Sequence, residues 1–432
     1  MKRTLALCMG ISIALGTCAE TYSLQQLFAL ADQNNKSITV SNTSKLVADE
    51  ALESAKAQRL PEISSELGIS YNGKGFITDR DFSNFTTIDI PEFGNSFTLK
   101  VNQVIYSGGA ISTAIRMNEL GQQMAQLSVE KNRQEVRFVI VGQYLDLYKL
   151  CQNITVLEKN ISLAEKVLQN MHTRYDNGTA LKNDITRYEL QLANLRLQKQ
   201  KVEAACRILS YQIATTVGLP EDTQIQPTED IERNTSSAAI DQPYWQQQAA
   251  TGNYGLQQAS LQTQMSQQKE RMAKAALMPK LMVFAEDYLN GPITIEIPAI
   301  NKNFNYWYVG VGLQYNLSSL FKNNHDVKRA RRATQQANEE LALAQEKVRI
   351  GVQAAVTNCH TAAVEVDTQQ KSVQLAEENY SVVSNRYNND LALLTDMLDA
   401  SNIKLSADLK LVEARINQLY CEYQLRYLAH QL

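Results

Sequence analysis

One eleven-residue pattern occurs twice in this chain, and it constrains the fold more than any other feature. Residues 174–184 read RYDNGTALKND, and residues 386–396, which lie 212 positions later, read RYNNDLALLTD. A second pair, AKAQRLPEI at 55–63 and AKAALMPKL at 273–281, recurs with an offset of 218. We therefore expect an internal duplication, with two halves of about 210 residues that follow one plan.

Each half is expected to run as helix, proline, strand, loop, strand, very long helix, repeated pattern and long helix. Glycine (18) and proline (8) are scarce among the 432 residues, so breaks are few and the helices must be long. We place the first half at 20–218 and the second at 243–432. Between them, residues 219–242 break the helical pattern and form a linker.

The long segments have the pattern of coiled coils. Residues 112–176 contain no proline, and as one helix they would extend roughly 97 Å at about 1.5 Å per residue, so they must lie along another helix. Apolar residues follow at alternating spacings of three and four, which is typical of a coiled-coil seam. The first seam is Ile185, Tyr188, Leu192, Leu195, Lys199, Val202, Cys206, Leu209 and Ile213, and residues 348–387 keep the same rhythm.

The repeated pattern then marks the turns of two antiparallel helical hairpins, with tips near 178 and 390. Gly178 supplies the backbone freedom for the first reversal. Asp184 falls in the first turns of the returning helix, where the helix dipole favours a carboxylate. Asp390 replaces the glycine in the second copy, and either Asn389 or Asp390 is able to adopt a left-handed conformation.

Four cysteines lie at matched distances from the two tips. Cys151 and Cys206 lie 27 residues before and 28 after the first tip, and Cys359 and Cys421 lie 31 before and 31 after the second. Because an antiparallel hairpin places each pair at one level, we predict the disulfides Cys151–Cys206 and Cys359–Cys421 in an oxidising compartment. The alternative is that all four are small buried hydrophobic residues.

Four segments, 62–72, 96–106, 280–289 and 305–317, are expected to be strands. They alternate apolar and polar residues, with aromatic residues toward the ends, which is typical of an outer-membrane barrel wall. A soluble sheet with one face on a core would alternate in the same way. The flanking helices are too polar and too long to supply that core, which favours the membrane. Four strands cannot close a barrel through lipid, so several chains must pool their strands.

The first residues have the layout of a secretory signal peptide. A basic start, an apolar stretch and small residues before Glu20 predict a signal at 1–19, cleaved after Ala19. An alternative is lipidation of Cys18, since Leu15 lies three residues before it. Beyond the signal no run of 18 apolar residues occurs, so a membrane crossing has to be made by strands.

Other function classes have little support in the sequence. The formal net charge is −3 with both signs interspersed, so nucleic acid is not an expected partner. The four histidines, His172, His325, His360 and His430, have no ligands at suitable spacing, and no metal site is expected. No catalytic serine motif or phosphate-binding loop stands in the right context, so we expect no catalytic residues, no cofactor and no enzyme activity.

These features together resemble the TolC family of trimeric outer-membrane efflux ducts, from Leu24 to the C-terminus. IYSGG at 105–109 and above all TDMLDA at 395–400 carry the resemblance. It implies a homotrimer in which twelve strands form one barrel in outer-membrane lipid. Twelve helices would form a hollow periplasmic cylinder closed at its tips, with residues 219–242 packed as a belt outside it.

The resemblance also implies site residues. Asp396 and Asp399 would form an acidic ring at the pore constriction, whereas the alternative is that they cap the start of a helix. The family closes its tips with a tyrosine, an arginine and an aspartate. Tyr387 and Asp184 match, but the arginine position is Ala392. The basic residues that would be able to substitute are Arg174, Arg386 and Lys182.

The expected function is therefore an exit duct of a tripartite efflux or type I secretion system, carrying drugs, metal ions or secreted polypeptide. A periplasmic adaptor would dock on the tip residues, including Tyr175, Gly178 and Asp390, and would connect the duct to an inner-membrane RND or ABC pump. The second hypothesis is a secreted periplasmic coiled-coil scaffold without a pore.

Overall fold

The structure, a computed structural model, describes residues 20–228 and 241–432. The expected signal peptide, Cys18 and residues 229–240 of the linker lie outside the described residues. The chain divides into two compact units, which we call the helical unit (Met1–Asn42, Ser128–Leu256 and Ala344–Leu432) and the sheet unit (Thr43–Leu127 and Gln257–Leu343). Each half of the sequence contributes to both units, so the units do not coincide with the two repeats.

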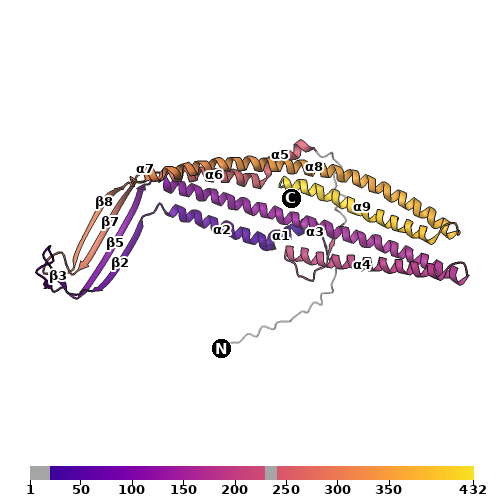
Figure 1. Ribbon diagram of the computed structural model, residues 1–432, viewed down its shortest axis with the longest axis horizontal. Coiled ribbons are helices and arrows are strands. Elements are labelled where there is room, and N and C mark those ends of the chain that lie inside the picture. The colour runs from indigo at the N-terminus through magenta and orange to yellow at the C-terminus, as the bar shows by residue number, and fades with distance from the viewer. Residues whose placement is uncertain (1–19, 229–240) are drawn as a thin grey trace, which may run out of the picture. The chain divides into compact units, whose positions relative to one another are not determined.

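The sheet unit contains a four-stranded antiparallel sheet in the order β2-β5-β7-β8 (Figure 1). The strands are β2 (Glu62–Tyr71), β5 (Phe93–Tyr106), β7 (Lys280–Gly291) and β8 (Phe304–Gln314). All four lie where the alternation places them. β5 starts three residues before position 96, and β8 ends three residues before position 317, at Gln314.

One face of this sheet is apolar and exposed. Along β8 the exposed fractions of Trp307, Val309, Val311 and Leu313 are 72%, 64%, 69% and 71%. No element of the unit covers these side chains, and a continuous apolar strand face of this kind is not expected to remain in water.

The opposite face carries an aromatic and acidic cluster. The Glu286 carboxylate on β7 accepts hydrogen bonds from the hydroxyls of Tyr288 and Tyr308, the latter at 2.6 Å. The rings of Tyr288 and Tyr306 stack with their centroids 5.2 Å apart. Their face alternates with the apolar one along β8, as the period of a strand requires.

Shorter elements complete the sheet unit. A small hairpin, β3 (Gly75–Ile77) with β4 (Thr86–Ile88), lies in the loop between β2 and β5 and was not expected from the sequence. The helix α6 (Tyr254–Ala275) precedes β7, and the short α7 (Ser319–Lys322) follows β8. The helix α2 (Lys36–Ala57) leads into β2, and its Leu52 and Ala55 pack against Ile115.

Two long helical hairpins form most of the helical unit (Figure 1). The first joins α3 (Ala110–Asp176, 67 residues) to α4 (Lys182–Val217), and the second joins α8 (Asn324–Asn388, 65 residues) to α9 (Leu394–Leu428). The shorter α1 (Leu24–Asn34) and α5 (Gln242–Gly252) accompany them. No helix in the described part of the chain combines the length and apolar character needed to cross a bilayer.

The predicted seam residues hold the hairpins together. Near the tips, Leu192 and Leu195 are buried with Leu157, Met171 and Met397 in one core cluster. Farther from the tips, a second core cluster joins α1, α3 and α4 through Leu27, Ala31, Ile140, Tyr144, Ile213 and Val217. Lys199, the one charged residue of the seam, is only partly buried, and its ammonium group forms an ion pair of 2.8 Å with Glu158.

A short parallel pair, β1 (Glu20–Tyr22) with β6 (Ile225–Pro227), was not expected from the sequence. It joins the start of the described chain to residues that we had assigned to the linker. Tyr144 of α3, whose side chain is fully buried, fixes the pair in place. Its hydroxyl donates to the carbonyl of Tyr22 at 2.7 Å and accepts from the backbone N–H of Thr228 at 2.9 Å.

Replacing Tyr144 by Phe is expected to lower the free energy of unfolding by about 1–3 kcal/mol, because two backbone groups at this junction lose their partner. Thermal unfolding and amide exchange at Thr228 would measure the loss. The matched control is Tyr211→Phe, since Tyr211 is 46% exposed. Equal unfolding midpoints for Tyr144→Phe and the parent chain would contradict the assignment.

Candidate functional site at the hairpin tips

The two tips have the same backbone geometry. At the first, Gly178 has φ +74°, its N–H donates to Tyr175, and the Thr179 N–H donates to the Arg174 carbonyl, both at 2.9 Å. At the second, Asp390 has φ +60°, its N–H donates to Tyr387 at 3.1 Å, and the Leu391 N–H donates to Arg386 at 2.8 Å. Both are left-handed helix ends that satisfy the last carbonyls. The second reversal therefore uses Asp390 and not Asn389.

Arg174 connects the first hairpin to the second. Its Nη1 donates to the backbone carbonyl of Tyr387 at 3.2 Å, and its Nη2 forms an ion pair with the Asp390 carboxylate. The guanidinium carbon lies 5.3 Å from the centre of the Tyr387 ring, close enough for a cation–π contact. We call Arg174, Tyr387 and Asp390 the tip latch.

Tyr387 and Asp184 lie close enough to interact. Tyr387 is 9% exposed, and burial raises the pKa of its hydroxyl, while the charge of Arg174 lowers that pKa and the charge of Asp184 raises it. Tyr387 is thus neutral near pH 7. Asp184 lies in the first turn of α4, where its N–H donates to the Leu181 carbonyl at 3.0 Å.

The structure distinguishes among the three basic residues considered for the missing arginine. Arg386 caps its own hairpin, because its Nη2 donates to the Leu391 carbonyl at 3.3 Å. Lys182 is exposed at the start of α4. Ala392 packs against the core cluster near the tips. Only Arg174 crosses between the hairpins, so the arginine of the latch comes from α3.

Asp396 and Asp399 both point away from the core. They are exposed, whereas Leu394, Met397 and Ala400 on the opposite side of this helix start are buried. The Asp396 carboxylate accepts from the Leu393 N–H at 3.1 Å, so the capping alternative describes what Asp396 does within one chain. Asp399 lies one turn later on the same side of α9. A capping contact leaves carboxylate oxygen lone pairs free for a second role.

The structure brings each predicted cysteine pair into contact but records all four as free cysteines, so neither predicted bridge is formed in it. Cys206 donates a hydrogen bond to Cys151, and this bond lowers the pKa of Cys151 and raises that of Cys206. Cys359 donates in the same way to Cys421.

Two further groupings near or below the tips were not predicted as sites. Tyr188 and Tyr380 of the seams lie near Tyr387. Burial raises the pKa of Tyr188, and Tyr380 and Tyr387 add smaller contributions in the same direction. Lys404 of α9 lies 5.3 Å from the ring centre of Tyr380 and 3.1 Å from Glu377. The spacing in the sequence predicted that these tyrosines are buried in the seams, but it does not indicate that they contact one another.

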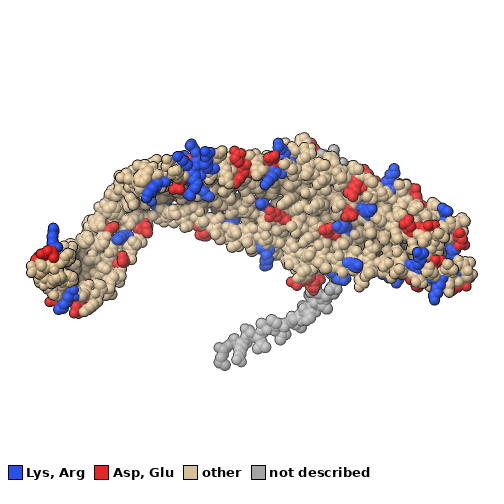
Figure 2. Space-filling model, viewed as in Figure 1, with Lys and Arg blue, Asp and Glu red and all other residues tan. Residues whose placement is uncertain are grey.

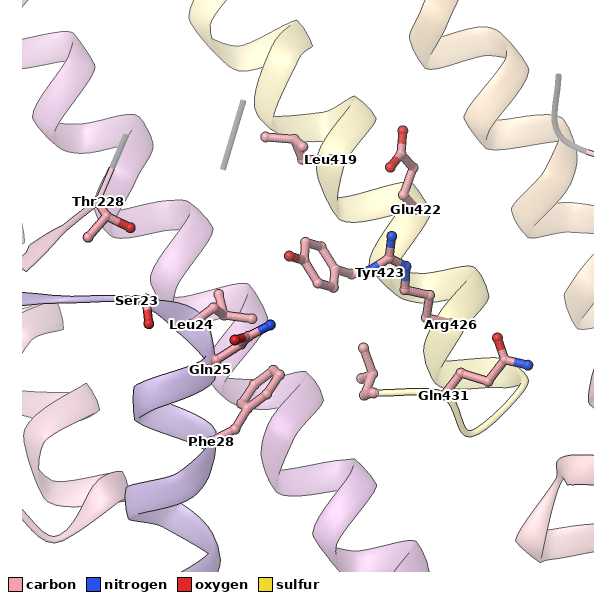
Figure 3. Close-up of a pocket in the computed structure, with 11 residues that line it drawn as sticks. Ser23, Leu24, Gln25, Phe28, Thr228, Leu419, Glu422, Tyr423, Arg426 and Gln431 are labelled. Carbon is pink, nitrogen blue, oxygen red and sulfur yellow. The ribbon is translucent and has the colours of Figure 1, made fainter. Parts of the chain in front are cut away.

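A groove between α1 and α9 lies away from the tips, with a volume of about 660 Å³. Figure 3 shows Phe28 of α1 and Tyr423 of α9 projecting into the space between these helices. The Arg426 guanidinium carbon lies 5.4 Å from the Tyr423 ring centre, and burial raises the pKa of Glu422. None of the predicted site residues lines this groove. In the described ranges, 20–228 and 241–432, no group of three or more His, Cys, Asp or Glu residues is arranged to hold a metal ion.

Comparison with known proteins gives one consistent family. The profile of a family described as "Outer membrane efflux protein" matches residues 27–219 and 245–429. The outer membrane efflux protein BepC of Brucella suis is 19% identical over 422 residues, which cover 97% of this chain and 88% of that protein. The outer membrane protein TolC of Salmonella enteritidis is 20% identical over 448 residues, which cover 100% of this chain and 87% of that protein.

Solved structures agree with this at the level of the fold. The outer membrane protein VceC of Vibrio cholerae superposes with a TM-score of 0.78 at 15% identity, over 94% of this chain and 96% of that one. The outer-membrane channel OprN superposes with a TM-score of 0.79 at 14% identity, over 95% and 90%.

A double-mutant cycle would test the tip latch. Arg174→Gln and Asp390→Asn are expected to show a coupling free energy of about 0.2–1 kcal/mol, because Asp390 is 73% exposed and water screens the pair. Asn keeps the left-handed turn accessible. The unfolding free energies of the parent, the single variants and the double variant give this coupling. Amide exchange at 387–391 should quicken in Arg174→Gln but not in the control Arg187→Gln, which removes an exposed charge from α4 and leaves the latch intact. Zero coupling with unchanged exchange would argue against the latch.

Proposed function

This chain belongs to the outer membrane efflux protein family, and on that premise we propose that it is a trimeric outer-membrane channel that serves as a passive exit duct. The homologues are channel proteins of the outer membrane, not enzymes. The observation that carries the proposal is the exposed apolar face of a sheet whose two edges, β2 and β8, are unpaired in one chain.

Lipid explains that face, and assembly resolves those edges. Val309, Val311 and Leu313 carry no hydrogen-bonding group in their side chains, so acyl chains can cover them without the loss of a hydrogen bond to water. Backbone N–H and C=O groups at an open edge have no partner in hydrocarbon, so β8 of one chain must pair with β2 of the next. Three copies would give a closed barrel of twelve strands. The two separate matches of the family profile, 27–219 and 245–429, support the internal duplication that supplies two strands per half.

The tip latch is proposed to hold the channel closed at the helical end. Arg174 ties the turn of the second hairpin to the first through Tyr387 and Asp390. Releasing this contact would allow the hairpins to separate. Asp396 and Asp399 lie directly beyond the second tip, and three copies would place six carboxylates around the axis, a ring that attracts cations and repels anions.

The tips also have the surface expected of a docking site. Leu181 and Leu393, which occupy equivalent positions in the repeated pattern, are each 69% exposed, and Leu391 is 67% exposed. Tyr175 adds an aromatic side chain that is 43% exposed. We propose that a periplasmic adaptor covers these residues and connects the duct to an inner-membrane RND or ABC pump, for efflux or type I secretion. The pore-free scaffold is not favoured, because it leaves the apolar sheet face without a covering.

We further propose that the two cysteine pairs close as disulfides in the periplasm. In each bridge two thiols lose two electrons and two protons, and a disulfide-bearing oxidoreductase is reduced to its dithiol. In each pair one cysteine, as its thiolate, would attack the disulfide of the oxidoreductase, and the second cysteine would then attack the resulting mixed disulfide and release the dithiol. The bridges would clamp each hairpin far from its tip and leave the tips free to move.

Counting thiols would test the bridges. The mature protein, isolated with an alkylating agent present, should show no free thiol at the four positions, and peptide mapping should recover Cys151–Cys206 and Cys359–Cys421. The control is expression in a strain whose periplasm cannot form disulfides, where the mature protein should show four free thiols. Four free thiols from the oxidising compartment would contradict the proposal.

Channel recording would test the proposed function. The purified protein should form ion-conducting pores in planar bilayers, and the pair Asp396→Asn with Asp399→Asn should lower the preference for cations. Asn keeps the oxygen that accepts from Leu393, so the helix start is retained. The matched control, Glu365→Gln with Asp367→Asn, removes two exposed carboxylates from α8. No conductance would favour the scaffold, and an equal effect of the control pair would contradict the acidic ring.

A further inference from the structure

A dense group of basic side chains lies at the start of α8, immediately after the sheet. Figure 2 shows Lys and Arg gathered over this part of the molecule. The group comprises Lys322, Lys328, Arg329, Arg331 and Arg332, and all five are exposed. We call it the basic collar. It belongs to the sheet unit, in which α8 follows β8 through the short α7.

The collar is electrostatically unfavourable within the chain itself. Arg329 and Arg332 are three residues apart, and Lys328 and Arg332 four, so like charges share one helix face and repel. Such an arrangement indicates that an anion outside the chain offsets the repulsion.

Neighbouring acidic groups compensate only part of this charge. Arg329 pairs with Asp326 at 3.2 Å, but both side chains are well exposed. Arg332 donates to the neutral Gln335 at 2.9 Å. The Glu270 carboxylate of α6 has a lowered pKa mainly because of its hydrogen bond to Lys274, and the charge of Arg331 adds a smaller effect. Glu270 is therefore already committed to another cation.

The residues between the sheet and the collar are apolar and exposed. Leu317, Leu320 and Phe321 have exposed fractions of 66%, 56% and 69%. The chain thus passes from the apolar face of β8, through an exposed apolar turn, to a group of cations. Acyl chains followed by phosphate headgroups have the same order along the normal of a bilayer.

We propose that the basic collar binds the headgroups of anionic phospholipids in the membrane leaflet at the α8 end of β8. Guanidinium and ammonium groups would donate to the phosphate oxygens, while Leu317, Leu320 and Phe321 contact the first methylenes of the acyl chains. The inference rests on the outer-membrane location and names a lipid partner for the channel. Its chemistry selects phosphatidylglycerol or cardiolipin over zwitterionic lipid, because only the former bring net negative charge.

The test uses the full-length protein purified from membranes and the triple variant Lys328→Gln, Arg329→Gln, Arg332→Gln. Both would be placed in vesicles of phosphatidylethanolamine with or without phosphatidylglycerol, and retained lipid would be counted by native mass spectrometry after delipidation. We expect the parent to retain phosphatidylglycerol selectively, and the variant to bind it about tenfold more weakly. The control, Lys201→Gln, Arg349→Gln, Lys371→Gln, removes the same charge from exposed positions of the helical unit and should bind like the parent.

Equal phosphatidylglycerol retention by the parent and the triple variant would overturn the proposal. The triple variant could instead retain lipid like the parent but lose binding to isolated cell-wall sacculi or show a changed anion conductance. Either result would assign the collar to another anion and would also overturn the proposal. Conductance in planar bilayers separates this failure from that of the proposed function. If the triple variant conducts normally, the proposed channel function is supported whether or not the variant binds lipid.

Discussion

The backbone hydrogen bonds at the two edges of the sheet are the constraint on which the rest of the structure depends. One chain ends its sheet at β2 and β8, and both edges carry unpaired N–H and C=O groups. In hydrocarbon such groups have no water to bind, so the apolar face on β8 is compatible with lipid only if another copy completes the ladder. In the proposed channel, the stability of the sheet and the pore would therefore have the same cause, which is assembly.

The long hairpins bury their apolar seams locally and need no single wide core. Several clusters of buried residues follow one another along the helical unit, one near the tips around Met171 and Met397 and another around Ile140 and Tyr144. Because each cluster is local, the change of conformation proposed at the tips would leave the packing farther along intact. The tip latch fits this division, since Arg174 joins the hairpins by a few polar contacts where the apolar contacts end.

Period and spacing were enough to place the strands and the hairpin turns, because both depend on residues close in sequence. Alternation located β7, and the repeated pattern located Gly178 and limited the second left-handed residue to Asn389 or Asp390, of which the structure uses Asp390. Spacing also paired the cysteines, since antiparallel helices match equal distances from a turn. The partner of Tyr387 was beyond the sequence, because choosing Arg174 over Arg386 depends on how two hairpins pack. The β1–β6 pair was missed for the same reason, as it joins segments about 200 residues apart.

The mass of the detergent-extracted particle tests the central claim most directly. The account predicts that the mature protein leaves the outer membrane only with detergent and that native mass spectrometry finds three chains in one particle. A water-soluble monomer would contradict it, because a single copy leaves β2 and β8 unpaired and the apolar face of the sheet exposed.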